Sequence, residues 1–214
     1  AVCLSVPFGI LGAVFLSESD PQNRLAKLTR FSAKLLTGFP SILAGVFAYG
    51  AVVIGGRVLG LGGFSAVAGG VALSVLMLPM VMLTAEEALR LVPRRMREAS
   101  YGMGATQTQT LFYVMLPSAL PGILTGVMLS VARAAGETAP LLFTALFSNY
   151  WLVSEGKIDL MQPTASMAVL IYNFSSMPFE NQIEMAWAAA LVLVMLVLVT
   201  NLIGQAFSRR SIQS

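Results

Sequence analysis

Long, uninterrupted apolar runs are the feature that most constrains this chain. Residues 186–198 are apolar on every face of a helix, and across the 214 residues 57% are hydrophobic and 11% charged. Soluble domains carry about a quarter charged residues. Strands of a membrane β-barrel alternate apolar and polar residues, which this run does not. The sequence therefore predicts an all-α integral membrane protein, folded as a polytopic helical bundle.

Hydropathy predicts five membrane spans, because a helix needs about 20 apolar residues to cross roughly 30 Å of hydrocarbon. The predicted spans cover residues 1–16, 35–54, 64–84, 122–147 and 185–207. The first would reach only about 24 Å as a helix, so we expect it to be the tail of a longer span. Residues 1–214 then form one transmembrane domain, whose longest basic connection is the loop 86–121.

The basic residues predict the orientation of the bundle. If the connections alternate between sides, ten of the thirteen Lys and Arg fall on one side: Arg24, Lys27, Arg30, Lys34, Arg90, Arg94, Arg95, Arg97, Arg209 and Arg210. Lys and Arg in short loops mark the cytoplasmic side. We therefore expect the C-terminus and the loop 86–121 to be cytoplasmic, and we interpret Glu86 and Glu87 as interfacial charges. Bases placed at membrane edges argue against nucleic-acid binding.

Several kinds of chemistry are excluded by residue type. The chain has no histidine, so a Ser-His-Asp triad is impossible. A P-loop needs Gly-x-x-x-x-Gly-Lys-Ser/Thr, and none of Lys27, Lys34 and Lys157 stands between Gly and Ser or Thr. The chain cannot hydrolyse ATP by that route. We predict no enzyme activity and no cofactor or metal bound by this chain.

The loop 86–121 carries the signals of a helical hairpin. Pro93 suits the first position of a short helix, which Gly102 and Gly104 should end. Thr106 or Thr108 can then cap a second helix. An exposed hairpin with apolar side chains is suited to fit a groove on another protein.

These residues resemble the EAA motif of permeases of ATP-binding-cassette importers. The pattern is Glu-Ala-Ala, a short gap, Gly, nine residues, then Ile-x-Leu-Pro. The matching positions are Glu98, Ala99, Ser100 in place of Ala, Gly104, Val114 in place of Ile, Leu116 and Pro117. The resemblance implies that these residues couple the chain to a separate cytoplasmic ATPase, which would bind ATP and Mg. The alternative is an ordinary basic loop between two helices.

Two opposite charges occur within the predicted span 122–147. Arg133 and Glu137 are four residues apart and so share a helical face, and charges within a span usually face a bundle interior or an aqueous path. Pro140 should kink the helix beside them. A guanidinium suits a tetrahedral oxyanion, so we assign Arg133, Glu137, Thr138 and Ser130 to the substrate path. A purely structural ion pair is the alternative.

The segment Arg133-Ala-Ala-Gly-Glu137-Thr-Ala-Pro140-Leu-Leu resembles the signature of the membrane subunits of phosphate importers, in particular the PstA type. The resemblance covers essentially the whole chain. It implies the type I importer permease (MetI-like) fold with six spans in the full subunit, in the bacterial or archaeal cell (inner) membrane. It also implies three kinds of partner: a homologous PstC-type permease, a PstB-type ATPase dimer and an external PstS-type phosphate-binding protein.

Other functions remain open at this point. A permease for sulfate, molybdate or tungstate would use the same machinery. A secondary transporter would use Arg133 and Glu137 as a proton relay, and a membrane scaffold would transport nothing. Two structural expectations concern the helices themselves. One is a short re-entrant or surface helix around residues 165–174, and the other is close helix approach at Gly56 and Gly60 and at Gly122 and Gly126.

Overall fold

The computed structural model describes residues 1–214 except 21, 61–62, 149–152, 155–156 and 211–214. In chain order its first half contains α1 (Val2–Glu18), α2 (Arg24–Gly38), α3 (Ser41–Ala48), the π-helical segment η1 (Tyr49–Ile54), α4 (Gly55–Val58), α5 (Ala66–Leu91) and α6 (Arg94–Gly102). The second half contains α7 (Gln107–Thr110), the π-helical segment η2 (Leu111–Met115), α8 (Leu116–Ala135), α9 (Ala139–Thr144), β1 (Val153–Ser154), β2 (Lys157–Ile158), α10 (Met167–Ser175) and α11 (Glu180–Arg210).

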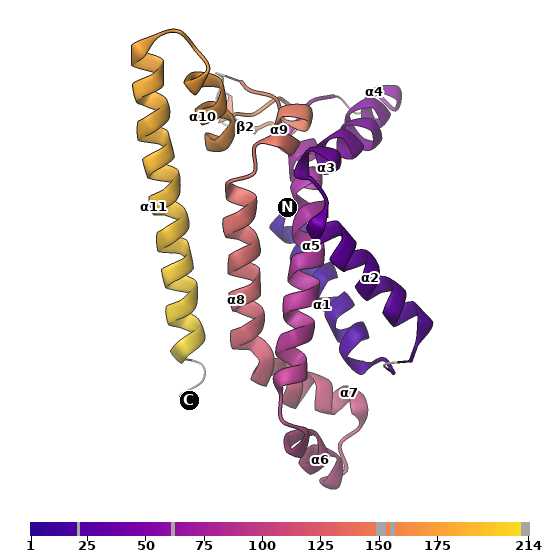
Figure 1. The fold of residues 1–214 in the computed structure, drawn as a ribbon. Coiled ribbons are helices and arrows are strands. Elements are labelled where there is room, and N and C mark those ends of the chain that lie inside the picture. The colour runs from indigo at the N-terminus through magenta and orange to yellow at the C-terminus, as the bar shows by residue number, and fades with distance from the viewer. Residues whose placement is uncertain (21, 61–62, 149–152, 155–156, 211–214) are drawn as a thin grey trace.

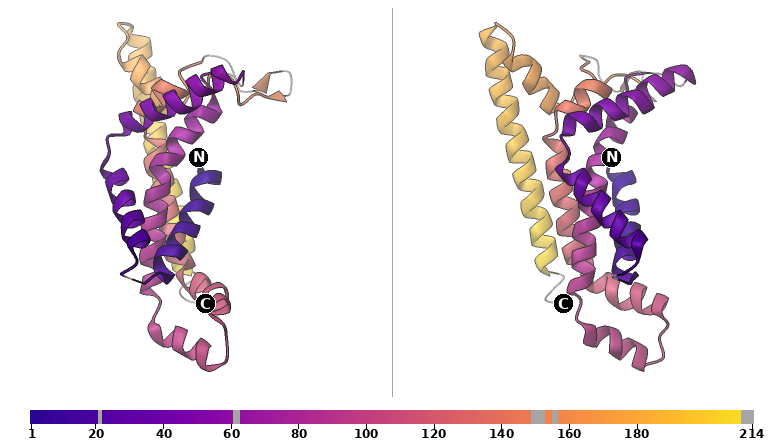
Figure 2. Two further views of the ribbon diagram at one scale, coloured as in Figure 1. Left: turned by 90° about the vertical axis from the view of Figure 1, so that its right-hand side faces the viewer. Right: turned by 45° about the vertical axis from the view of Figure 1, so that its right-hand side comes forward.

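Helix α5 is the centre of the bundle. It packs against α1, α2, α3, α8 and α9, whereas α11 packs against α8 and α10 (Figure 1). Half of the most apolar stretch of α5 is buried, against 6% of that of α11. In the right-hand view of Figure 2, α8 lies between α5 and α11, and it packs against both. The all-α bundle predicted from the apolar runs is therefore confirmed, with the antiparallel pair β1–β2 as a short addition.

Four stretches of helix among the described residues are long and apolar enough to cross a membrane. They are Ser41–Val58, Ala66–Leu91, Gln107–Ala135 and Glu180–Gly204, and the apolar helix Val2–Glu18 is shorter. These five helices correspond in order to the five predicted spans. Their bounds differ where a local signal acts, most of all after residue 135.

The expectation of a single helix over 122–147, kinked at Pro140, is wrong. Helix α8 ends at Ala135 with Gly136 as its C-cap, and a separate helix α9 begins at Ala139. Pro140 lies in the first turn of α9, where its missing N–H leaves no hydrogen bond unmade. Pro140 thus helps to start a new helix instead of kinking the old one.

The second predicted span also begins later than expected. Pro40 separates α2 from α3, so the span runs from Ser41 to Val58 and ends four residues after its predicted end at 54. Most of the residues between the first two predicted spans form the helix α2. The Asn23 side chain caps this helix by accepting a hydrogen bond from Leu25 N at 2.9 Å. Basic and apolar side chains alternate along α2, so its mean hydropathy is low and a search for apolar runs does not find this helix.

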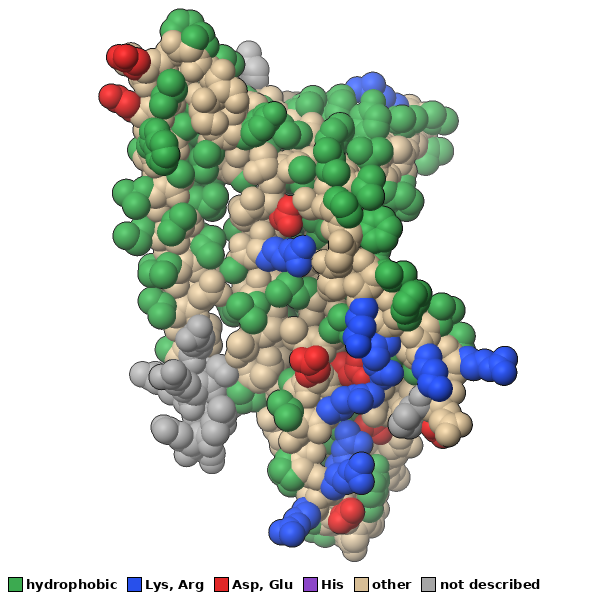
Figure 3. Space-filling view, in the orientation of Figure 1, with side chains coloured by type: hydrophobic (Ala, Val, Ile, Leu, Met, Phe, Trp, Pro, Cys, Tyr) green, Lys and Arg blue, Asp and Glu red, His purple; other side chains and the backbone are tan. Residues whose placement is uncertain are grey.

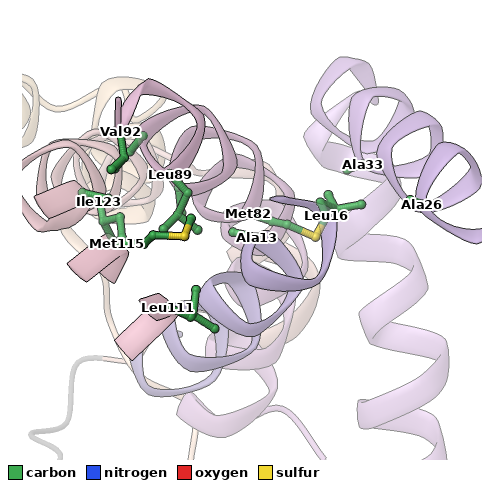
Figure 4. Packing of buried hydrophobic residues seen from close by; sticks show 13 residues of the cluster. Ala13, Leu16, Ala26, Ala33, Met82, Leu89, Val92, Leu111, Met115 and Ile123 are labelled. Atoms are coloured by element: carbon green, nitrogen blue, oxygen red, sulfur yellow. The ribbon is translucent and has the colours of Figure 1, made fainter. Parts of the chain in front are cut away.

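The core between α1, α5 and α8 depends on small residues. A Cβ atom added to Gly122 would lie 2.8 Å from Ala88 Cβ, and one added to Gly126 would meet the Thr84 side chain. The predicted close approach at these two glycines is confirmed. Around them, Leu89, Met115 and Ile123 point toward one another (Figure 4).

Candidate functional site

The break between α8 and α9 brings the predicted path residues to one place. Arg133 lies in the last turn of α8, and Glu137 and Thr138 lie in the connection to α9. The Arg133 Nε atom is 3.6 Å from Glu137 Oε1. The pair therefore flanks a helix end, whereas the sequence placed it near the middle of a span.

The two side chains differ in exposure, and this determines what each can do. The Arg133 side chain is 43% exposed and that of Glu137 is 16% exposed. Both border a recess between α5 and α8 that is too narrow in this conformation to hold a water molecule, together with Leu76, Met77 and Met80 of α5. Arg133 can reach a ligand while Glu137 holds it from the protein side. A basic residue in the last turn is also favoured by the helix dipole.

Ser130 and Thr138 contribute unequally. Ser130 lines the same recess but is only 1% exposed. Its hydroxyl already donates a hydrogen bond to Val127 O of the same helix at 2.7 Å. Thr138 is partly exposed and precedes α9, but its side chain makes no capping hydrogen bond. The Thr138 hydroxyl is thus better placed than that of Ser130 to meet a polar ligand.

Two glycines of other helices leave the space in which α9 packs closely. A Cβ on Gly45 of α3 would lie 2.6 Å from Pro140 Cα, and one on Gly69 of α5 would lie 3.0 Å from Leu141 and Ala145. Leu141 and Ala145 also pack with Val169 of α10. The predicted helix around 165–174 is therefore present as α10, and it supports the connection that carries Glu137.

The predicted hairpin projects from one end of the bundle (Figure 1). It consists of α6, a turn and α7. Two residues predicted to shape the turn, Gly104 and Thr106, do so. Gly104 has φ +85°, a left-handed conformation that favours glycine. The Thr106 and Gln109 side chains form a capping box, with Thr106 N donating to Gln109 Oε1 at 2.8 Å. The cap is thus Thr106 and not Thr108.

The predicted coupling residues fall into an outer and an inner group. Glu98, Ala99, Gly104 and Pro117 are exposed, while Val114 and Leu116 are partly buried in a helix that runs without interruption from α7 through η2 into α8. Ser100 is 3% exposed. The part of Ser100 in coupling therefore stays a prediction, and at this exposure it would act through the residues that Ser100 contacts.

Ser100 joins the two arms of the hairpin. Its hydroxyl lies 2.9 Å from Thr110 Oγ1, and Thr110 is fully buried. The Ser that replaces Ala in the EAA pattern thus has a structural partner ten residues away. Exposed apolar side chains, among them Met103 (82%) and Phe112 (59%), cover the hairpin on the outside, as a docking surface requires.

Glu86 is the main correction to the charges predicted at this end of the bundle. We expected an interfacial carboxylate, but Glu86 is 4% exposed. It accepts hydrogen bonds from Arg30 at 2.5 and 3.1 Å and is 2.9 Å from Arg90 Nη2. The hydrogen bond to Glu86 raises the pKa of Arg30 above its ordinary value. Arg30 and Glu86 are 56 residues apart, so no sequence spacing indicates the pair.

Most of the basic residues assigned to one side do gather at one end. Figure 3 shows Lys and Arg side chains over the lower part of the molecule, where α2, the end of α5 and α6 lie. The bases of these elements are Arg24, Lys27, Arg30, Lys34, Arg90, Arg94, Arg95 and Arg97. Helix α11 ends at the same level (Figure 1). No group of three His, Cys, Asp or Glu able to hold a metal occurs within the described ranges.

Comparison with known proteins identifies similar sequences over nearly the whole chain. Residues 5–213 match the family described as "Binding-protein-dependent transport system inner membrane component". The phosphate transport system permease protein PstA of Yersinia pestis is 38% identical over 205 residues, which cover 96% of this chain and 66% of the relative. A probable PstA of Methanocaldococcus jannaschii is 34% identical over 200 residues, covering 92% and 67%. The chain spans about two thirds of the length of these relatives.

Solved structures share the fold. An inward-facing structure of the MetNI methionine ABC transporter has a TM-score of 0.68 at 20% identity, covering 98% of this chain and 90% of that chain. An amino acid ABC transporter crystallised with histidines has a TM-score of 0.61 at 18% identity, covering 98% and 88%. At these identities the likeness concerns the fold alone, that of a type I importer permease.

Proposed function

This chain belongs to the family of inner membrane components of binding-protein-dependent transport systems, and on that premise we infer that it is a permease subunit of an ATP-driven importer of inorganic phosphate. The observation that carries the substrate is the 38% identity to PstA over 96% of the chain. The site supports it, because Arg133 presents a guanidinium at a helix break beside a recess.

We propose that Arg133 attracts the phosphate anion. Its planar guanidinium offers paired N–H donors that match two oxygens of a tetrahedral oxyanion. Glu137, at 3.6 Å, orients the guanidinium between transport events, and Thr138 offers a hydroxyl to a phosphate oxygen. Ser130 shapes the wall of the path.

The α6–α7 hairpin is proposed to dock on the ATPase. Exposed apolar side chains on a rigid, capped turn suit a groove of another protein, and Glu98, Ala99 and Gly104 lie on its outside. The partners we propose are a homologous PstC-type permease, a PstB-type ATPase dimer that binds ATP and Mg, and a PstS-type binding protein. The end of the bundle that carries α6 and the C-terminus would then be cytoplasmic.

Uptake by an Arg133→Gln variant tests the path. We expect the complex to assemble with its ATPase while phosphate uptake falls about ten-fold or more, since hydrogen bonds to charged groups contribute about 1.5–3 kcal/mol. Arg24→Gln is the matched control, because it removes an exposed base of α2 far from the break. Equal uptake by Arg133→Gln and wild type would refute the assignment and favour a structural ion pair.

Two measurements separate the alternative transport functions. Competition of uptake by sulfate, molybdate or tungstate would assign the machinery to another oxyanion. Uptake that needs a proton gradient and no ATP would indicate a secondary transporter with Arg133 and Glu137 as its relay.

A further inference from the structure

The end of α1 makes a polar contact with both arms of the hairpin. Glu18 is the last residue of α1, and its Oε2 accepts a hydrogen bond from Gln107 Nε2 of α7 at 2.9 Å. Its Oε1 lies 3.4 Å from Arg97 Nη2 of α6. One carboxylate therefore contacts two helices that are joined by the Gly104 turn.

The surroundings of Glu18 make this contact more than a surface ion pair. The side chain of Glu18 is 17% exposed and that of Arg97 is 26% exposed. Within the described part of the chain, Glu18 Oε1 is buried and has no hydrogen-bond partner, so the charge of Arg97 is what compensates it. Charged atoms removed from water are costly when left without a partner.

Apolar packing beside Glu18 connects the same elements. Leu111 of η2 belongs to the buried cluster that includes Ala13 and Leu16 of α1 (Figure 4). Covalently, the hairpin continues α5 on one side and α8 on the other. The Glu18 contacts add α1 as a third element joined to the hairpin.

We propose that Glu18 is a positioning residue that fixes the angle of the α6–α7 hairpin against α1. The proposal rests on the coupling function given above. A docked ATPase that moves the hairpin then also moves α1, through Arg97 and Gln107, besides α5 and α8. Removing the charge loosens the hairpin and lowers the amount of substrate carried per ATP hydrolysed.

The test uses the full-length chain in its complete complex, reconstituted in proteoliposomes. Glu18→Gln keeps an acceptor for Gln107 but loses the ion pair, and Asp20→Asn is the matched control at an exposed carboxylate two residues away. The first measurement is the spread of distances between spin labels at Leu11→Cys on α1 and Thr108→Cys on α7, with the native cysteines replaced by Ser. The second is phosphate carried per ATP hydrolysed.

We expect Glu18→Gln to broaden the distance distribution and to lower the transport-to-hydrolysis ratio by about two- to thirty-fold, the range for residues on a coupling route. The double variant Glu18→Arg with Arg97→Glu should restore part of both. A distribution as narrow as in Asp20→Asn, or an unchanged ratio, overturns the proposal. If the wild-type complex carries no phosphate, the proposed substrate is refuted instead. The distance measurement would still test whether Glu18 holds the hairpin against α1.

Discussion

Replacing Glu86 by Gln should destabilise the bundle at the junction of α2 and α5. Glu86 is buried and its strongest contact is to Arg30, whose Nε and Nη2 atoms both donate to it. The Arg30 side chain is 23% exposed, so a hydrogen bond to a charged group keeps most of its usual contribution of about 1.5–3 kcal/mol. Arg90 is 51% exposed and pairs at i,i+4 spacing, which contributes about 0.3–0.5 kcal/mol.

The expected loss for Glu86→Gln is therefore about 2–3 kcal/mol, most of it from Arg30. For a chain of this size each kcal/mol lowers the unfolding midpoint by about 2–4 °C, so we expect a fall of about 4–12 °C. Arg90→Gln should lower the midpoint by less than about 2 °C, because the pair it breaks is solvent-exposed.

The assay is the thermal unfolding of the purified full-length chain in detergent, followed by near-ultraviolet circular dichroism. Arg30→Gln should cost about as much as Glu86→Gln, and the double variant less than the sum, since both remove one interaction. A loss for Glu86→Gln no larger than that for Arg90→Gln would refute the burial and the role of Arg30.

Two further predictions concern packing. Ser100→Ala should lower the free energy of opening the hairpin by about 1–3 kcal/mol, because it leaves the buried Thr110 hydroxyl unpaired. The double variant Ser100→Ala with Thr110→Val should be nearly neutral. Hydrogen exchange of the hairpin measures both, and a single variant as mild as the double one would contradict the pairing. Gly126→Ala should lower the free energy of unfolding by about 1–3 kcal/mol, because the added methyl group overpacks against Thr84. Gly50→Ala is the control, since the added Cβ has no neighbour within 4 Å among the described residues. Equal unfolding midpoints for the two variants would contradict the close approach at Gly126.

The hairpin could be predicted from sequence because its signals are local. Pro93, Gly104 and Thr106 each act within one turn of where they stand. Gly104 and Thr106 take the expected positions, whereas Pro93 is the N-cap of α6, one residue before the first helical position expected for it. The helical run through 107–135 was harder to predict, because Pro117 suggests a boundary but lies within this continuous helix, just after the π-helical segment η2.

The sequence predicts which residues form the candidate path, but not that they lie at a break between two helices. The i,i+4 spacing of Arg133 and Glu137 indicates their contact, and Pro140 indicates a disturbance of the helix. The complete break depends on space that Gly45 and Gly69 leave for α9, and these residues lie on other helices. Contacts between distant segments, such as Arg30 with Glu86, likewise follow from the tertiary fold.

Uptake of radiolabelled phosphate by the reconstituted complex tests the central claim most directly. Proteoliposomes would contain the full-length chain, its partner permease and the ATPase, with the binding protein supplied on the opposite side from the nucleotide. We predict phosphate accumulation that requires ATP and persists in the presence of excess sulfate. Accumulation without ATP, or loss of phosphate uptake to sulfate competition, would contradict it.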